Sequence, residues 1–183
     1  MTGPKPVELA AIWAQDSQGV IGSGTGMLWR VPADLRFFKA QTSGCPVIMG
    51  RRSWEALGGA LPDRTNIVIT TDPNYHAPNA LVAPDWSEAL RLAREAAAEK
   101  DSPTIWVTGG ARVYAETLPL MDRLVVTHLD LTADPAAVAR APQLDPETWA
   151  PDPDRSDTQW RERSGDARWK VITYLPKIET SCP

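Results

Sequence analysis

The chain has 183 residues, enough for one domain with a sizeable core and too few for two comfortable ones. Its net charge of −4 excludes the basic footprint of a nucleic-acid or anionic-membrane partner, and no apolar run approaches the length of a membrane span. The two cysteines and two histidines are far apart in the sequence, without the spacing of a metal site or a disulfide framework. We therefore expect the protein to work in a reducing cytoplasm and to use a cofactor for its chemistry.

Predicted strands and helices alternate along the chain, which is typical of a mostly parallel sheet with helices on its faces. The last two strands flank a Ser-Gly-Asp turn and form an antiparallel hairpin. We predict a single α/β domain over residues 1–183, with an eight-stranded central sheet, flanking helices and this C-terminal hairpin. The predicted strands are 7–14, 46–50, 66–71, 81–83, 104–108, 124–131, 159–163 and 169–175, and the predicted helices are 33–42, 51–57, 89–99 and one that follows Gly110.

Two polar segments are predicted as loops. Residues 15–26 are rich in glycine around the apolar pair Val20-Ile21, a composition that indicates either a mobile flap over a ligand or an ordinary solvent loop. Residues 132–157 are rich in proline, alanine and acid, which predicts a long surface loop with one helical turn near residues 135–139.

The stretch from Met27 to Phe38 leads the glycine-rich loop through Trp29 into a helix that proline opens. Asp34, Leu35 and Phe38 are spaced so that an acid shares a helix face with apolar groups. Asp34 is therefore either an exposed first-turn acid that favours the helix dipole, or a carboxylate in an apolar pocket where it would hold a ligand with paired N–H donors.

Two strands run through glycine directly into a helix, and both junctions are candidate phosphate sites. The first junction follows Gly50 and carries two arginines and a serine, although a solvated helix start would explain the same residues. The second has adjacent glycines, Gly109 and Gly110, which allow the backbone to approach a ligand closely. A tight turn explains one glycine better than two, so the second junction is the more specific signal.

Most of the chain carries motifs that are specific in combination. They are Ile12-Trp13-Ala14, Val20-Ile21-Gly22, Trp29-x-x-Pro32-x-Asp34, Val47-Ile48-Met49-Gly50-Arg51-x-Ser53-Trp54-Glu55, Leu61-Pro62-x-Arg64-x-Asn66, Gly109-Gly110-x-x-Val113-Tyr114 and Thr127. Residues 9–131 and the final hairpin thereby resemble the dihydrofolate reductase family, of the bacterial type and most like its actinobacterial members.

The resemblance implies an enzyme that reduces 7,8-dihydrofolate to tetrahydrofolate with NADPH, by hydride transfer to C6 and protonation at N5, in support of one-carbon, thymidylate and purine metabolism. It implies a cytoplasmic monomer that also binds antifolates, with no metal, membrane or nucleic-acid partner. One alternative is another reductase of the same fold that acts on a pyrimidine-type riboflavin precursor, although such enzymes lack the Trp29 and Asp34 arrangement. The other is a non-enzymatic nucleotide-binding module.

The resemblance also implies a role for individual residues. Asp34 would orient the pterin, Thr127 would hydrogen-bond that carboxylate, Trp29 would hold a water, and solvent near Met27 would deliver the proton. The substrate would contact Ile12, Trp13, Ala14, Leu35, Phe38, Leu57, Leu61, Thr108 and Tyr114, with Arg64 on the glutamate tail. The cofactor would contact Ala14, Ile21, Gly22, Gly50, Arg51, Arg52, Ser53, Thr70, Thr71, Thr108, Gly109, Gly110, Ala111, Arg112, Val113 and Tyr114.

Four departures from the family pattern limit this transfer of roles. Leu28 replaces the commoner proline before Trp29, and Ala111 replaces a third glycine. Thr108 stands where isoleucine or valine is usual, and residues 132–157 lack the family's Gly-Asp-Thr-x-Phe-Pro stretch. Contacts made by that stretch therefore cannot be carried over.

Overall fold

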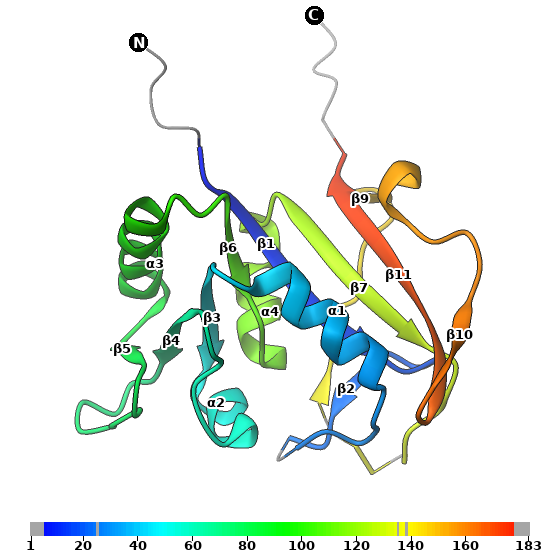
Figure 1. The fold of residues 1–183 in the computed structure, drawn as a ribbon, viewed down its shortest axis with the longest axis horizontal. Coiled ribbons are helices and arrows are strands. Elements are labelled where there is room, and N and C mark those ends of the chain that lie inside the picture. The colour runs from blue at the N-terminus through cyan, green and yellow to red at the C-terminus, as the bar shows by residue number, and fades with distance from the viewer. Residues whose placement is uncertain (1–5, 25, 135, 138, 178–183) are drawn as a thin grey trace, which may run out of the picture.

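The computed structural model describes residues 6–24, 26–134, 136–137 and 139–177, which form a central sheet with helices on both faces (Figure 1). The sheet contains β1 (Glu8–Gln15), β3 (Pro46–Gly50), β4 (Thr65–Ile69), β5 (Leu81–Ala83), β6 (Thr104–Val107), β7 (Arg123–Leu129), β9 (Trp149–Pro151), β10 (Arg161–Ser164) and β11 (Ala167–Pro176). Eight of these follow the order β10-β11-β7-β1-β6-β3-β4-β5, and β9 pairs with β11.

The strand pairs divide the sheet into a parallel and an antiparallel part. From β7 across β1, β6, β3 and β4 to β5, every pair is parallel. On the other side, β11 runs antiparallel to β7, β9 and β10. The predicted α/β fold, with a mostly parallel eight-stranded sheet and an antiparallel C-terminal hairpin, is confirmed.

The helices begin close to where capping residues predict them. They are α1 (Pro32–Thr42), α2 (Arg51–Leu57), α3 (Trp86–Lys100), α4 (Ala111–Thr117) and the 3-10 turns η1 (Leu118–Leu120) and η2 (Pro153–Arg155). Proline occupies the first turn of α1, and the Asp85 side chain caps α3 by accepting the N–H of Glu88 at 2.9 Å. None of the helices in the described part of the chain is long and apolar enough to cross a membrane.

The core lies in two layers, because side chains alternate between the faces of each strand. On one face, Ile12, Val47 and Val125 pack with Phe37 of α1 and Trp54 of α2. On the other face, one cluster lies against α4 and another, rich in alanine, lies against α3. Figure 1 shows α1 in front of the sheet and α4 behind it. Helices α1 and α2 therefore share the face on which Asp34 lies.

The two segments predicted as loops contain strands. β2 (Val20–Gly22) pairs with β8 (Ala139–Arg140) in a second, two-stranded sheet, so the flap and the late segment are joined by hydrogen bonds. Residues 132–157 also hold β9 and η2, and Trp149 is buried in the core, so the prediction of a surface loop was wrong there. Backbone pairing with distant segments compensates for the missing local periodicity.

The helical turn predicted near residues 135–139 is only partly testable. Pro135 and Val138 lie outside the described residues, and Ala139 belongs to β8. A 3-10 turn forms instead at Pro153–Arg155, where the Asp152 side chain accepts the N–H of Asp154. Asp152 and the proline after it supply the cap and the first-turn residue that favour this position.

Candidate active site

The two glycine junctions lie side by side at the carboxyl ends of neighbouring parallel strands. Gly50 ends β3 and leads into α2, and Gly109 follows β6 and leads toward α4. The N–H of Gly50 donates to the carbonyl oxygen of Gly109 at 2.9 Å. The edge of an open parallel sheet is where ligands of α/β proteins bind, so both junctions belong to one candidate site.

Glycine is required at the second junction. Gly109 has φ +133°, and a Cβ atom there would lie 2.8 Å from Oγ of Ser53. A Cβ atom on Gly110 would lie 3.0 Å from the same oxygen. The peptide bond between the two glycines is cis. A ligand at this junction would therefore contact the backbone and the Ser53 hydroxyl.

Asp34 is the buried acid of the site. The structure places it on the inner face of α1, 8% exposed, where the hydroxyl of Thr127 on β7 donates to its Oδ1 at 2.6 Å. Burial raises the pKa of Asp34, while the Thr127 hydrogen bond and the charge of Arg161 act in the opposite direction. The alternative of an exposed first-turn acid is therefore wrong.

Trp29 lies in the same layer as Asp34 and is buried. Its indole Nε1 has no hydrogen-bond partner among the described residues. A buried indole N–H that lacks a partner is unfavourable, and a small polar ligand or a water would satisfy it.

Apolar candidate residues lie on the same face of the sheet as this acid. Ile12 is buried and Phe38 and Leu61 are half-buried in the cluster of that face, whereas Trp13 is buried on the opposite face against Tyr114. Three further apolar candidates are exposed to solvent: Leu35 is 45% exposed, Leu57 47% and Met27 60%. Leu35 directly follows Asp34 on α1, so an exposed apolar side chain adjoins the buried carboxylate, as in a site that an apolar ligand covers.

Tyr114 ties α4 to the carboxyl-terminal half of β1. Its hydroxyl donates to the carbonyl oxygen of Ile12 at 2.6 Å, and its ring centroid lies 5.0 Å from that of Trp13. Burial raises the pKa of the Tyr114 hydroxyl, so it stays a neutral donor. The backbone of Thr108, directly after β6, is fixed to β3, because its N–H donates to the carbonyl oxygen of Ile48 at 2.9 Å.

The arginines of the candidate cofactor end are exposed and paired with their own neighbours. Nε of Arg51 lies 2.8 Å from Oε1 of Glu55, and its guanidinium lies over the ring of Tyr75 at 4.6 Å. Arg112 pairs with Glu116 on the same helix at 2.7 Å. The remaining candidates are exposed Arg52 and Thr71, buried Thr70 and Gly22, and half-buried Ala14, Ile21, Ala111 and Val113.

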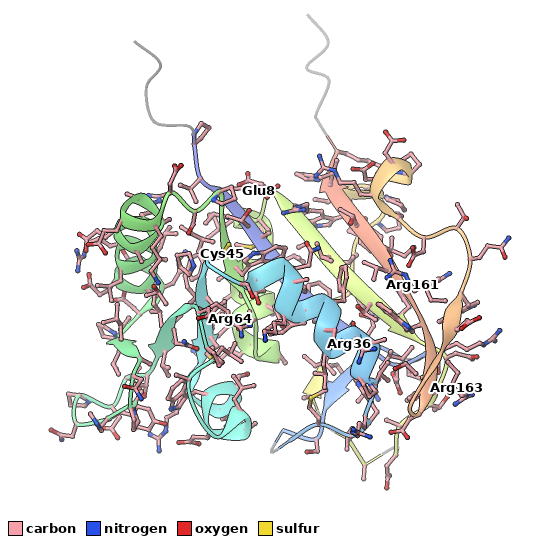
Figure 2. All side chains as sticks on the ribbon, in the orientation of Figure 1. Glu8, Arg36, Cys45, Arg64, Arg161 and Arg163 are labelled. Atoms are coloured by element: carbon pink, nitrogen blue, oxygen red, sulfur yellow. The ribbon has the colours of Figure 1, made fainter. Side chains whose placement is uncertain are left out.

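Arg64 lies on the side of α1 that faces away from the C-terminal hairpin (Figure 2). Its Nε donates to the carbonyl oxygen of Pro62 at 2.8 Å, and its Nη1 donates to the hydroxyl of Thr42 at 2.9 Å. Partial burial lowers the pKa of this guanidinium. Arg64 is therefore held in place by the end of α1, although the sequence indicates only an ordinary turn arginine without the resemblance.

Sequence reasoning missed Asp16, which holds the base of the flap. This residue is buried, and its Oδ1 accepts the N–H groups of Gln18 and Val20, both at 2.8 Å. Its Oδ2 accepts the N–H of Ala133 at 2.8 Å, so one carboxylate joins the flap to the late segment. A single acid in a polar loop is common, and no local pattern marks this one.

Glycine junctions at the carboxyl edge of a parallel sheet and a buried carboxylate on one face of that sheet are typical of an α/β enzyme that binds a nucleotide and a second small ligand. Residues 8–174 match the family model described as dihydrofolate reductase. The chain belongs to the dihydrofolate reductase family, which confirms the family that the motifs indicated.

Three individual proteins illustrate the similarity. The chain is 38% identical over 168 residues to the dihydrofolate reductase of Mycobacterium tuberculosis, covering 89% of this chain and 94% of that one. It is 41% identical over 169 residues to the dihydrofolate reductase of Mycobacterium leprae, with the same coverage of 89% and 94%. The structure of dihydrofolate reductase from Enterococcus faecalis complexed with NADP(H) and RAB-propyl superposes with a TM-score of 0.79 at 32% identity, covering 93% and 96% of the chains.

Proposed function

We propose that this chain reduces 7,8-dihydrofolate to 5,6,7,8-tetrahydrofolate with NADPH, by hydride transfer to C6 and protonation at N5. The family match and the curated relatives support this oxidoreductase activity, and the NADP(H) complex of the Enterococcus faecalis enzyme supports the cofactor. The observation that carries the proposal is the buried carboxylate of Asp34, hydrogen-bonded to Thr127 and followed on α1 by the exposed side chain of Leu35.

Asp34 orients the pterin ring. A carboxylate accepts hydrogen bonds from a ring N–H and an exocyclic amino group together, which is the pattern of donors that the pterin presents. Thr127 holds one carboxylate oxygen and lowers the pKa that burial raises. Trp29 donates its unpartnered indole N–H to a water beside the ring. The substrate is thus fixed in position by groups that do not reorganise during the reaction.

The apolar residues exclude water from the reacting atoms. Ile12 forms the inner wall, Leu35 and Leu57 close the outer one, and solvent near Met27 delivers the proton to N5. Trp13, whose ring lies on the opposite face of the sheet beside Tyr114, is a further proposed contact. Phe38, Leu61, Ala14, Thr108 and Tyr114 complete the substrate contacts, and Arg64 pairs with a carboxylate of the glutamate tail.

The cofactor end fits a dinucleotide phosphate. Gly109 and Gly110 leave open the space that a Cβ would fill beside the Ser53 hydroxyl, which suits a pyrophosphate. Arg51 and Arg52 meet the 2′-phosphate, which favours NADPH over NADH. Bound NADPH supplies the hydride. The other proposed contacts are Ala14, Ile21, Gly22, Gly50, Thr70, Thr71, Thr108, Ala111, Arg112, Val113 and Tyr114.

The wider setting is proposed on the same basis. Residues 1–183 form one domain that acts as a monomer in the cytoplasm, without a nucleic-acid partner. Antifolates that carry a diaminopteridine bind in the substrate's place, because their ring donors also need the Asp34 carboxylate.

The test is NADPH oxidation, followed by absorbance, with and without dihydrofolate, in the wild type and in Asp34→Asn. We expect oxidation that depends on dihydrofolate and that falls by about two orders of magnitude or more in the variant at pH 7. NADPH binding, measured by fluorescence titration, should stay within about twofold of the wild type.

Each outcome has a distinct meaning. Loss of NADPH binding together with turnover in Asp34→Asn would indicate misfolding and would remove the evidence for the role of the acid. NADPH binding by the wild type without any dihydrofolate-dependent oxidation would contradict the proposed activity and leave the fold intact. Other pteridines and riboflavin precursors would then be the next substrates to try.

A further inference from the structure

A second cleft lies on the opposite side of α1 from Arg64, between that helix and the C-terminal strands. It encloses about 210 Å³ and contains none of the residues proposed above for substrate or cofactor. Its lining residues are Phe37, Gln41, Arg123, Val125, Arg155, Arg161, Val171 and Thr173. Figure 2 shows Arg161 on the β10 side of α1 and Arg64 on the other side, so the cleft and the glutamate-tail position are separated by the helix.

Three arginines from three different elements line this cleft: Arg123 from β7, Arg155 from η2 and Arg161 from β10. Valine side chains from β7 and β11 and the ring of Phe37 supply its apolar surface. The Arg123 side chain is only 16% exposed, whereas those of Arg161 and Arg155 are 40% and 54% exposed. A guanidinium that is partly removed from water attracts an anion more strongly, so this applies most to Arg123.

Aromatic rings hold two of these guanidinium groups in place. Arg161 lies 4.4 Å from the ring centroid of Trp169 and 5.7 Å from that of Phe37. Arg123 lies 5.2 Å from the ring centroid of Trp106. Groups that are already ordered lose little conformational entropy when a ligand binds.

Carboxylates satisfy the arginines only in part. Asp157 takes Nε and Nη2 of Arg161 at 2.7 and 3.1 Å, and the same carboxylate also accepts the N–H of Val171. Glu8 takes one Nη of Arg123 at 2.7 Å, but the buried Nε of Arg123 has no hydrogen-bond partner among the described residues. A buried charged donor without a partner is costly, so Glu8 satisfies Arg123 only in part.

We propose that this cleft binds a small, doubly charged oxyanion, either a phosphate group or a short dicarboxylate. The planar arginine fork matches both groups with paired hydrogen bonds. The volume suits a molecule smaller than a drug-sized ligand or a dinucleotide. Glu8, Asp152 and Asp157 each pair with one arginine of the cleft, so an anion must compete with these carboxylates or use the N–H donors that they leave free.

The test is a titration of the full chain with inorganic phosphate and, separately, with succinate, followed by NMR of the arginine Nε–H resonances. It is run with and without saturating NADPH, because the proposed cofactor site also attracts phosphate. We expect saturable shifts of the Arg123 and Arg161 resonances at millimolar concentrations that persist when NADPH is bound.

Charge changes at Gln41 test the cleft without touching its arginines. Gln41 is half-buried on α1 and lines the cleft, so Gln41→Glu should weaken binding about tenfold and Gln41→Lys should strengthen it severalfold. Arg161→Gln should weaken binding at least tenfold. The matched control is Arg168→Gln, which removes another arginine that pairs with an aspartate, Asp130, and lies over a tryptophan ring outside the cleft.

Binding of either probe that follows this pattern supports the site, and the probe that binds more tightly identifies the ligand class. Absence of saturable binding by both probes would overturn the proposal. Equal weakening in Arg168→Gln and Arg161→Gln would also overturn it, because it would show an effect of net charge alone. Thermal unfolding of each variant verifies that it is folded. No outcome depends on turnover of dihydrofolate.

Discussion

The two ends of the proposed active site differ in burial and in how their charged groups are paired. At the substrate end, Asp34 and Thr127 are buried and hydrogen-bonded to each other. At the cofactor end, Arg51 and Arg112 are exposed and form ion pairs with acids on their own helices. The buried groups of the substrate end are already in position for the proposed ligand. At the cofactor end, an arginine would have to leave its ion pair before it could bind a phosphate.

This difference predicts where mutations have large effects. A change in a buried charged hydrogen bond alters an interaction worth about 1.5–3 kcal/mol. Exposed ion pairs within a helix contribute only about 0.3–0.5 kcal/mol, so releasing an arginine from one costs little. Effects on ligand binding and turnover should therefore be largest at the glycine junction and the buried acid, and smallest among the surface charges.

The largest of these effects is expected at the Gly109-Gly110 junction of the cofactor end. Gly109→Ala places a Cβ at φ +133° and within 2.8 Å of the Ser53 hydroxyl, so the unfolding free energy should fall by about 1–3 kcal/mol. NADPH binding should weaken as well, because the backbone and Ser53 must move apart. Urea unfolding and NADPH titration measure the two effects.

Gly50→Ala is the matched control for that prediction. Gly50 has an ordinary φ of −74°, and its added Cβ would meet a flexible methyl group of Val113 at 3.2 Å. Its loss of stability should be clearly smaller. Equal losses in the two variants would show that conformational strain at Gly109 is not what requires glycine.

The second prediction concerns the hydrogen bond at the substrate end. Thr127→Val removes the donor to Asp34 and should lower kcat/KM for dihydrofolate about tenfold, with NADPH affinity unchanged. Thr117→Val makes the same substitution at a buried threonine that bonds the carbonyl oxygen of Val113, away from the acid. A similar fall in kcat/KM for both variants would argue against a specific role of Thr127.

The third prediction concerns the cofactor end, where effects should be smaller. Arg51→Gln should raise the Kd for NADPH severalfold and leave the Kd for NADH nearly unchanged, because only NADPH carries the 2′-phosphate. Glu55→Gln frees Arg51 from its ion pair and should lower the Kd for NADPH about two- to threefold. Weaker NADPH binding by Glu55→Gln would show that the Arg51–Glu55 ion pair favours cofactor binding and does not compete with it.

The smallest expected effect is on stability and follows from the pKa of Asp34. Burial raises this pKa, so the native state binds a proton more readily than the unfolded state does. The unfolding free energy of the wild type therefore falls as the pH rises from about 4 through the raised pKa. Asp34→Asn lacks this loss, so its stability relative to the wild type should be higher at pH 7 than below pH 4.

Urea unfolding at both pH values measures that difference. A relative stability that is the same at pH 4 and pH 7 would contradict an acid whose pKa is raised by burial. The same variant should lose turnover while its stability relative to the wild type rises from acid to neutral pH.

Much of the fold follows from local signals in the sequence. Pro32 and the capping aspartate Asp85 set the starts of α1 and α3, and short apolar runs match seven of the eight predicted strands closely. The eighth, predicted at 159–163, begins only at Arg161. These features are predictable because turn, cap and strand preferences depend on neighbours within a few residues.

The candidate site was predictable only in part. The glycine junctions are visible as strand–glycine–helix patterns, and the motifs that resemble the family identified Asp34 and Thr127 together. The buried Trp149, the β2–β8 pairing and the contacts of Asp16 have no such signal. The β2–β8 pairing and the Asp16–Ala133 hydrogen bond join segments more than a hundred residues apart, and the burial of Trp149 depends on which side chains cover it.

The sequence by itself therefore determined the order of strands and helices, the glycine turns and the chemical groups available at the sheet edge. Only the tertiary structure decided that Asp34 is buried against Thr127, which lies 93 residues away, and that Arg51 is engaged by its own helix. It also brought three arginines from separate elements to one cleft. Burial and charge pairing depend on which distant surface packs against a residue, and local preference carries no information about that.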